Sequence, residues 1–361
     1  MINLRVHQEI KGIQYLRGIA AMSVVIYHLS MQLHWMAAAS NVNLSTLAAG
    51  VDLFFVISGF IMVYSTGGGA MVSPYEFLER RLIRIVPLYW LATALVVVVL
   101  LPAPQLARQT ILAFPHVLAS FAFLPAPHPS APTIYAPLVY VGWTLNYEML
   151  FYALFAAGIA FGRQSAGRVV AIASLPILIL SVIGLVFLPR GLLGFYANPI
   201  MLEFVFGMCL ALVLLNVPKS KVYTWLCMAA LIALFSLPAA TDYDRSLRYG
   251  LIASVVVGAS IVAVWRPIRP LELLGDASYS IYLSHFFVLS AFAQLWRHTL
   301  GKPSSLMSIS SFYVVGATCA AFAGVLCWLL VEKPVTAWLK ASRRALTDPA
   351  IDRDPALRKQ T

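Results

Sequence analysis

The stretch Gln14–His28, QYLRGIAAMSVVIYH, belongs to an apolar run of membrane-spanning length and carries two ionisable side chains, Arg17 and His28. They are eleven positions apart, so at about 100° per residue they share one face of a helix, about 16 Å apart along its axis. Lipid cannot satisfy a charged group, so ionisable residues inside a span face the protein interior and indicate function. Alone, Arg17 is equally well explained as a snorkelling residue near the cytoplasmic end of the span. The alternative for His28 is a hydrogen-bonded interior histidine. Together on one stripe, they favour a polar site inside the membrane.

The composition of the 361 residues is that of a polytopic membrane protein. Hydrophobic residues make up 61% and charged residues 11%, and the mean hydropathy is +0.84, which leaves too little polar surface to cover a soluble globule. The net charge of +11 does not indicate nucleic-acid binding, because the basic residues lie in short connections between apolar runs, without interleaved aromatic residues. We therefore expect the chain to contact a lipid bilayer and no nucleic acid.

Apolar runs near twenty residues long predict an all-α protein with about ten membrane-spanning helices. The even number places both termini on one side, and most of the 25 lysine and arginine residues then lie on that side, which the positive-inside rule assigns to the cytoplasm. A further apolar stretch, 111–124, is short and interrupted by Pro115, so we expect an interfacial or re-entrant segment there. The predicted spans are residues 12–33, 47–65, 86–103, 137–161, 167–187, 199–216, 222–238, 246–265, 279–298 and 308–331.

We expect one transmembrane domain, residues 1–340, followed by a basic cytoplasmic tail, residues 341–361. No internal repeat is evident in the sequence. The four cysteines all fall inside apolar runs, so neither a disulfide framework nor a Cys-X-X-Cys site is expected. The seven histidines are scattered along the chain without metal-ligand spacing, and we expect no metal.

Asp52 lies near the outer end of the second predicted span, in the stretch GVDLFFVISGF of residues 50–60. His28 lies a similar distance from the outer end of the first span, and antiparallel neighbours can bring the two side chains to one depth. A carboxylate beside an imidazole orients it, so we expect Asp52 to support His28 as a general base. The alternative is that Asp52 caps the start of the second helix.

Three arginines, Arg80, Arg81 and Arg84, lie at the inner end of the third span, in RRLIRIVPLYW (residues 80–90). Their spacing makes a compact basic cluster, with Arg80 and Arg84 on one helical face. Guanidinium groups bind phosphates with paired hydrogen bonds, so the cluster is a candidate phosphate site. Because the positive-inside rule also places arginines here, the cluster alone is equally a topology signal.

Further polar side chains fall inside the predicted spans. Glu148, in WTLNYE, lies near mid-membrane and must be paired, hydrogen-bonded or protonated, and Glu203 is a similar case nearer the outer face. The ninth span begins with LGDASYSIYLSH, residues 274–285, whose hydroxyls could equally serve as structural hydrogen bonds between helices. The candidates of this kind are Tyr147, Glu148, Glu203, Ser278, Tyr282 and His285.

These motifs occur in one order along most of the chain: Arg17-X10-His28, GVDLFFVISGF, RRLIRIVPLYW, WTLNYE and LGDASYSIYLSH. Together they resemble the membrane-bound acyltransferase-3 family, and within it the bacterial exopolysaccharide O-acetyltransferases. The resemblance implies transfer of an acyl group, commonly acetyl, from cytoplasmic acyl-CoA to a carbohydrate hydroxyl at the bacterial inner membrane. The acceptor would be an exopolysaccharide or its lipid-linked precursor, and polysaccharide-assembly proteins would be further partners.

The resemblance also implies roles for individual residues. His28 and Arg17 would be the essential pair, and Arg81 and Arg84 match the family's Arg-X-X-Arg motif. We expect acyl-CoA to dock its phosphates on the arginine cluster, and His28 to deprotonate the acceptor hydroxyl. The alternative mechanism is nucleophilic attack by His28, which would form an acyl-histidine intermediate.

A rival interpretation from another functional class is a proton-coupled transporter. Its proton relay would consist of Arg17, His28, Asp52, Glu148 and His285. Transporters often carry inverted repeats and paired broken helices, and neither is evident in this sequence.

Overall fold

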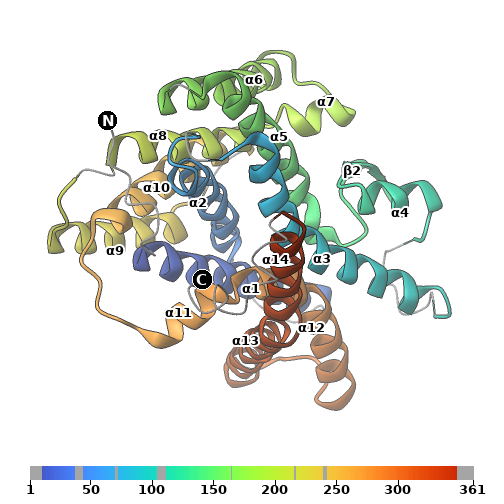
Figure 1. Cartoon of the computed structure of the whole chain (residues 1–361). Helices are drawn as coiled ribbons and strands as arrows, with labels where there is room; N and C mark the ends of the chain where they lie inside the picture. Colours follow the sequence, from blue (N-terminus) through green and yellow to red (C-terminus); the bar gives the residue numbers. More distant parts are fainter. Residues whose placement is uncertain are drawn as a thin grey trace.

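The structure is a computed structural model, and it describes residues 10–36, 44–69, 72–103, 111–163, 165–214, 217–238 and 242–347. This part of the chain is a bundle of helices with one two-stranded hairpin (Figure 1). The predicted all-α class is therefore confirmed.

The first half of the chain supplies four of the five helices that line the cavity described below. Ser73 begins the third of them, since its Oγ accepts a hydrogen bond from the backbone N–H of Glu76 and Pro74 occupies the first helical position. The predicted span 86–103 is therefore the later part of a helix that starts well before it. The elements are α1 (Lys11–Trp35), a 3₁₀ turn (Ser45–Ala49), α2 (Gly50–Ser65), α3 (Pro74–Leu100), α4 (Phe114–Phe121), β1 (Pro127–His128), β2 (Ala131–Tyr135) and α5 (Trp143–Gly162).

The second half closes the bundle. Its last two helices are joined without a break by a five-residue π-helical segment, Trp328–Glu332. The elements are α6 (Ala166–Phe187), α7 (Gly191–Tyr196), α8 (Leu202–Leu214), α9 (Lys221–Ser236), α10 (Asp242–Val262), α11 (Arg269–Asp276), α12 (Ser278–Thr299), α13 (Leu306–Cys327) and α14 (Lys333–Thr347).

Eight helical segments in the described residues are long and apolar enough to cross a membrane. They match eight of the ten predicted spans and confirm a polytopic protein. The other two predicted spans, 222–238 and 279–298, also form helices, α9 and α12. However, α9 has only 16 residues, and α12 carries polar side chains along its length. Ten spans therefore remain a prediction.

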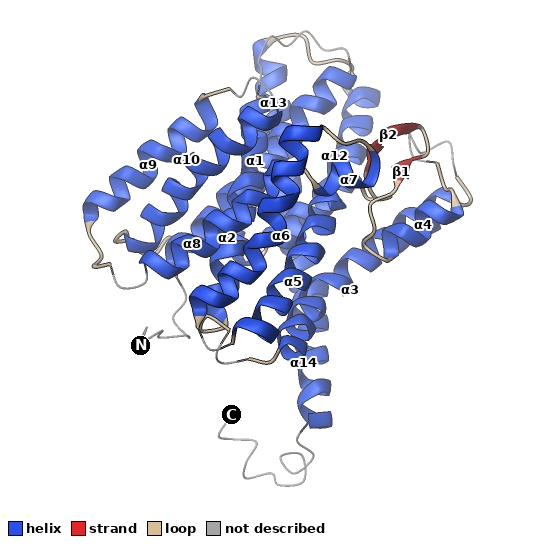
Figure 2. Cartoon of the chain, turned by 90° about the horizontal axis from the view of Figure 1, so that it is seen from above, coloured by secondary structure: helices blue, strands red, loops and turns tan. Residues whose placement is uncertain are grey.

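The stretch 111–124 does not span the bundle. It contains α4, which has only eight residues, and it is followed by the antiparallel hairpin of β1 and β2. These elements stand to one side of the helical bundle, beside the C-terminal end of α3 (Figure 2). The imidazole of His116 ties them together, because its Nε2 lies 2.8 Å from the carbonyl oxygen of Ala136.

Two close helix contacts set the positions of α2 and α11. A Cβ on Gly59 of α2 would collide with the backbone carbonyl of Phe204 in α8, so only glycine allows this approach. In the same way, Gly275 of α11 lies against the backbone carbonyl of Gln14 in α1. The second contact brings the start of α12 next to Arg17.

Helix α14 packs along the N-terminal part of α3. Arg343 of α14 places Nε 2.7 Å from an Oε of Glu79 and Nη2 3.4 Å from an Oε of Glu76. The predicted boundary at residues 340 and 341 therefore falls within a helix that continues to Thr347, and residues 348–361 lie outside the described part. The division into a domain and a tail remains a prediction.

Candidate active site

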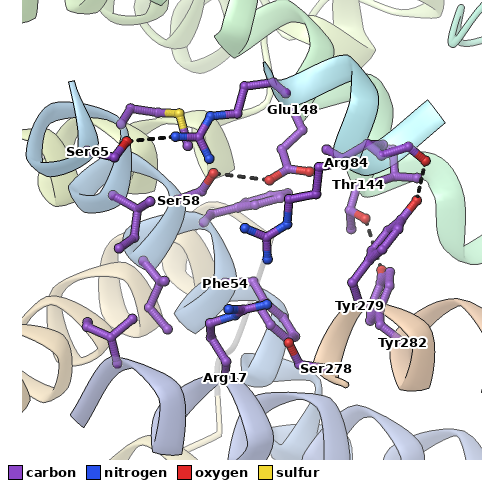
Figure 3. A pocket seen from close by; sticks show the side chains of 18 of the residues that line it. Arg17, Phe54, Ser58, Ser65, Arg84, Thr144, Glu148, Ser278, Tyr279 and Tyr282 are labelled. Carbon is purple, nitrogen blue, oxygen red and sulfur yellow. Dashed lines mark hydrogen bonds between the residues drawn. The ribbon is translucent and has the colours of Figure 1, made fainter. Parts of the chain in front are cut away.

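A cavity of about 510 Å³ lies between α1, α2, α3, α5 and α12 (Figure 3). Its walls combine apolar side chains, such as Ile13, Phe54 and Met62, with an unusual concentration of polar groups. The polar residues that line it are Gln14, Arg17, Ser58, Tyr64, Ser65, Arg81, Arg84, Thr144, Glu148, Tyr152, Ser278, Tyr279 and Tyr282.

Three of these residues are arginines, and none of the three forms an ion pair among the described residues. Arg81 donates from Nη2 to the Oγ of Ser65 at 2.7 Å and lies over the ring of Phe77, 5.6 Å from its centroid. Arg17 donates from Nη1 to the Oε1 of Gln14 at 2.8 Å. The side chain of Arg84 extends into the space between Glu148 and Arg17 (Figure 3). The cavity lining thus holds three cations and one acid, Glu148, which interacts electrostatically with all three. The excess of positive charge in the lining attracts an anion.

The carboxylates near the cavity are held by neutral donors. Glu148 accepts a hydrogen bond of 3.1 Å from the Oγ of Ser58. Glu332, at the end of the π-helical segment, accepts one from the Oγ of Ser280. Asp276 likewise accepts a hydrogen bond from the side-chain amide of a glutamine in α1. These acids also interact electrostatically with the cavity arginines. Because none of them forms an ion pair with an arginine of the cavity in the described part of the chain, the guanidinium groups can still bind a ligand.

His28 lies behind one wall of this cavity. The wall is Tyr282, whose ring centroid lies 5.9 Å from that of Phe54 and 5.8 Å from that of His285. His285 is fully buried, and its Nε2 lies 3.3 Å from the Nδ1 of His28. The structure thus brings two predicted site residues, from α1 and α12, into direct contact.

The predicted contact between Asp52 and His28 is wrong. The Oδ2 of Asp52 instead lies 3.0 Å from the Nη2 of Arg245 in α10, and the fully buried Glu203 of α8 interacts electrostatically with both. The reason is the rotation of α2, which turns Asp52 toward α8 and α10. Capping does not explain Asp52 either, because it stands in the first turn, after the N-cap residue Ala49.

Two other predicted site residues lie away from the cavity. Arg80 is exposed and pairs with Glu76, one turn earlier on α3. Tyr147 stacks on the ring of Phe195, with centroids 4.3 Å apart, and donates its hydroxyl hydrogen to the carbonyl of that residue. Both have structural partners outside the site.

Ser278 and Tyr282 both line the cavity. Tyr282 also donates to the carbonyl oxygen of Val141 at 2.9 Å, and its Oη lies 3.0 Å from the Oγ1 of Thr144. These bonds hold its ring between the cavity and the histidine pair.

Sequence reasoning missed several lining residues. Ser58 and Ser65 are seven positions apart on α2, so a shared helical face was the available signal. Tyr279 precedes Tyr282 by one turn and donates to the carbonyl oxygen of Ile85 at 2.8 Å, which joins α12 to α3. Glu332, which is not part of the cavity lining, was visible as an acid at the end of an apolar run. The described residues contain no group of three or more metal-ligating side chains.

Comparison with known proteins decides the family. The family profile described as an acyltransferase domain matches residues 10–332, nearly the whole chain. The chain belongs to the acyltransferase-3 family. One relative is the exopolysaccharide production protein ExoZ of Rhizobium meliloti. It is 36% identical to this chain over 299 residues, which cover 80% of this chain and 89% of ExoZ.

Two further relatives of this acyltransferase-3 protein are larger. The O-acetyltransferase OatA of Staphylococcus aureus is 26% identical over 320 residues, 77% of this chain and 50% of its own length. The putative peptidoglycan O-acetyltransferase YrhL of Bacillus subtilis is 26% identical over 329 residues, 78% of this chain and 49% of its own length. The chain thus spans about half of these two relatives. No solved structure matches it.

Proposed function

We propose that this acyltransferase-3 protein is an O-acyltransferase of the bacterial inner membrane. It moves an acyl group, commonly acetyl, from cytoplasmic acyl-CoA to a hydroxyl of a cell-surface carbohydrate. The observation that carries the proposal is the cavity of about 510 Å³, next to the histidine pair, whose three arginines form no ion pair with any described residue.

The chemistry of the cavity fits an acyl-CoA. Phosphate groups would bind Arg81 and Arg84, with Arg17 further along the path, because guanidinium–phosphate hydrogen bonds are charge-assisted. The apolar walls, including Ile13 and Met62, suit the uncharged pantetheine arm. Arg80 is left out of this donor site, because it is exposed and paired with Glu76.

The reaction itself is assigned to His28. His28 takes the proton of the acceptor hydroxyl while the hydroxyl oxygen attacks the thioester carbonyl carbon. The carbon–sulfur bond breaks, and the proton passes to the departing sulfur, so the products are the ester and free CoA thiol. In the alternative mechanism, His28 itself attacks the thioester and carries the acyl group. Labelled acetyl-CoA without acceptor distinguishes them, since only the second mechanism leaves the label on His28.

The acceptor class rests on the relatives. One is named an exopolysaccharide production protein and another a putative peptidoglycan O-acetyltransferase, and both names support a carbohydrate hydroxyl as the acceptor proposed for this chain. Polysaccharide-assembly proteins would then be neighbours of this chain in the membrane.

A direct assay tests the proposal. Polysaccharide from a strain that lacks the gene serves as acceptor for the purified protein in lipid nanodiscs with acetyl-CoA. We expect release of CoA that depends on the acceptor, and a mass gain of one acetyl group per modified sugar. An intact thioester in the presence of this acceptor would overturn the proposal.

The sidedness has its own test. Because most basic residues lie on the side of the termini, a reporter fused after Thr361 should be active only in the cytoplasm, and one inserted at Ser130 only outside. Two reporters active on the same side would exclude the ten-span arrangement with a cytoplasmic donor site.

The five residues of the proton relay that the transporter interpretation requires do not form one continuous chain of contacts in the structure. They lie in three places: Arg17 and Glu148 at the cavity, His28 with His285, and Asp52 with an arginine of α10.

A further inference from the structure

The two histidines meet inside the membrane-spanning bundle at hydrogen-bonding distance. The Nε2 of His285 lies 3.3 Å from the Nδ1 of His28, the ring centroids are 4.9 Å apart, and the ring planes are tilted by 53°. In contacts of this kind the position of each hydrogen decides what the rings can do.

Contacts with backbone carbonyl oxygens show which ring nitrogen of each histidine carries a hydrogen. The Nδ1 of His28 lies 2.9 Å from the carbonyl oxygen of Val24, and the Nδ1 of His285 lies 3.2 Å from that of Ile281. A carbonyl oxygen only accepts hydrogen bonds, so each Nδ1 carries a hydrogen. In a neutral imidazole the other nitrogen then carries a lone pair.

The contact between the rings agrees with this assignment. The Nδ1–H of His28 faces the lone pair on the Nε2 of His285 and is shared with the carbonyl of Val24. The opposite tautomers would direct a ring lone pair at each carbonyl oxygen, which is repulsive. One arrangement therefore satisfies all three contacts, and it leaves the Nε2 of His28 as the free lone pair.

We infer that His285 is a positioning residue, which holds the His28 ring in the Nδ1–H tautomer with Nε2 turned to the reacting groups. The inference rests on the function proposed above. When Nε2 takes the proton of the acceptor hydroxyl, Nδ1–H donates more strongly to His285, which stabilises the imidazolium until the proton leaves with the CoA sulfur. His285 thus fills the place that a carboxylate occupies in many catalytic triads.

A neutral partner suits this position. A buried carboxylate inside the membrane requires a cation or several hydrogen bonds, as Asp52 has with Arg245. An imidazole accepts a hydrogen bond without carrying a charge. The base can therefore be oriented without a second buried ion.

Two substitutions separate positioning from packing. In His285→Gln the amide oxygen can accept the hydrogen bond of His28. His285→Leu removes the acceptor and fills the space with an apolar side chain. We expect the leucine variant to lower kcat by about 10²-fold, the lower end of what general-base catalysis contributes. The KM for acetyl-CoA should stay unchanged, because His285 does not line the cavity. The glutamine variant should recover most of kcat.

Ser284→Ala is the matched control. This serine precedes His285 on α12, and its buried Oγ has no hydrogen-bond partner in the part of the chain that the structure describes. Its kcat should equal that of the parent protein. Equal losses in the glutamine and leucine variants, or a loss that appears in KM alone, would overturn the positioning role.

The tautomer has a test that needs neither turnover nor a variant of His285. Histidine-labelled protein in nanodiscs gives ¹⁵N signals, and those of His28 are identified by their absence in His28→Ala. We expect a protonated Nδ1 and an unprotonated Nε2 for His28, and the reverse would overturn the inference. Since this measurement uses no substrate, it separates failure of the inference from failure of the proposed function.

Discussion

Helix α2 contributes residues to two buried clusters of charged side chains. The charges are paired in the first cluster, whereas the arginines of the second form no ion pair with any described residue. Near the start of α2, Asp52 is paired with Arg245 and lies beside Glu203, and these residues join α2 to α8 and α10. Farther along, Ser58 and Ser65 face the cavity, where the arginines form no ion pair with any described residue.

The difference between the two clusters indicates a structural role for the paired charges and a ligand-binding role for the unpaired ones. A buried charge that finds its partner inside the protein stabilises one arrangement of helices. A buried charge that is left without a counter-ion costs stability, and it persists where a ligand supplies the partner. The two groups should therefore respond to substitution in opposite ways: one in folding, the other in donor binding and turnover.

The largest effect is expected at His28, next to the cavity. His28→Ala should lower kcat by about 10²–10⁴-fold, because a general base is removed. Donor binding should persist, since His28 does not line the cavity. Calorimetry with acetyl-CoA and a turnover assay on the same sample check both parts. Loss of donor binding would instead place the donor on the other side of Tyr282.

Arg245→Leu tests the paired group. Removing the cation leaves Asp52 and Glu203 buried without it, which should cost about 3–5 kcal/mol of folding free energy. The thermal unfolding temperature of the purified protein should fall, whereas the KM for acetyl-CoA of the folded fraction should not change. A raised KM at unchanged unfolding temperature would assign Arg245 to the donor site.

Arg84→Ala tests the unpaired group. Loss of one charge-assisted contact, worth about 1.5–3 kcal/mol, should raise the KM for acetyl-CoA by roughly 10–150-fold. The unfolding temperature should not fall, because Arg84 has no hydrogen bond or ion pair within the described residues. Arg80→Ala is the matched control on the same helix, and equal effects of the two would remove the distinction between them.

The smallest effect is expected at the surface contact of α14 with α3. Arg343→Ala removes the ion pairs with Glu76 and Glu79, and partly exposed pairs of this kind contribute about 0–1 kcal/mol. Unfolding temperature should change little, and any change should shrink at high salt. A large, salt-independent loss would show that this contact belongs with the buried pair of Asp52.

Some of the site was predictable from single residues. Arg17, Arg84 and Glu148 are ionisable groups inside or beside apolar runs, a costly placement that the sequence displays directly, and all three line the cavity. Hydroxyl groups carry no such cost, so Ser58 and Ser65 were not distinguished from ordinary helix contacts.

Pairings between helices were not predictable in the same way. Asp52 was assigned to His28 because the first two spans are neighbours in sequence. Its partner, Arg245, comes from α10, which packs on α2 although it lies far along the chain. The depth of a residue follows from counting along a span, whereas its direction depends on which helices surround it. The contact of His28 with His285 is of the same kind.

The π-helical segment between α13 and α14 determines which face of α14 is turned toward α3. A π turn holds more residues than an α turn, so it shifts the faces of the following helix relative to the preceding one. Beyond it, Arg343 of α14 reaches α3, while Glu332 at its end turns to Ser280. Deleting one residue from Trp328–Glu332 would rotate α14 by about 100° and move Arg343 off α3. The length of this segment is therefore constrained independently of its side chains.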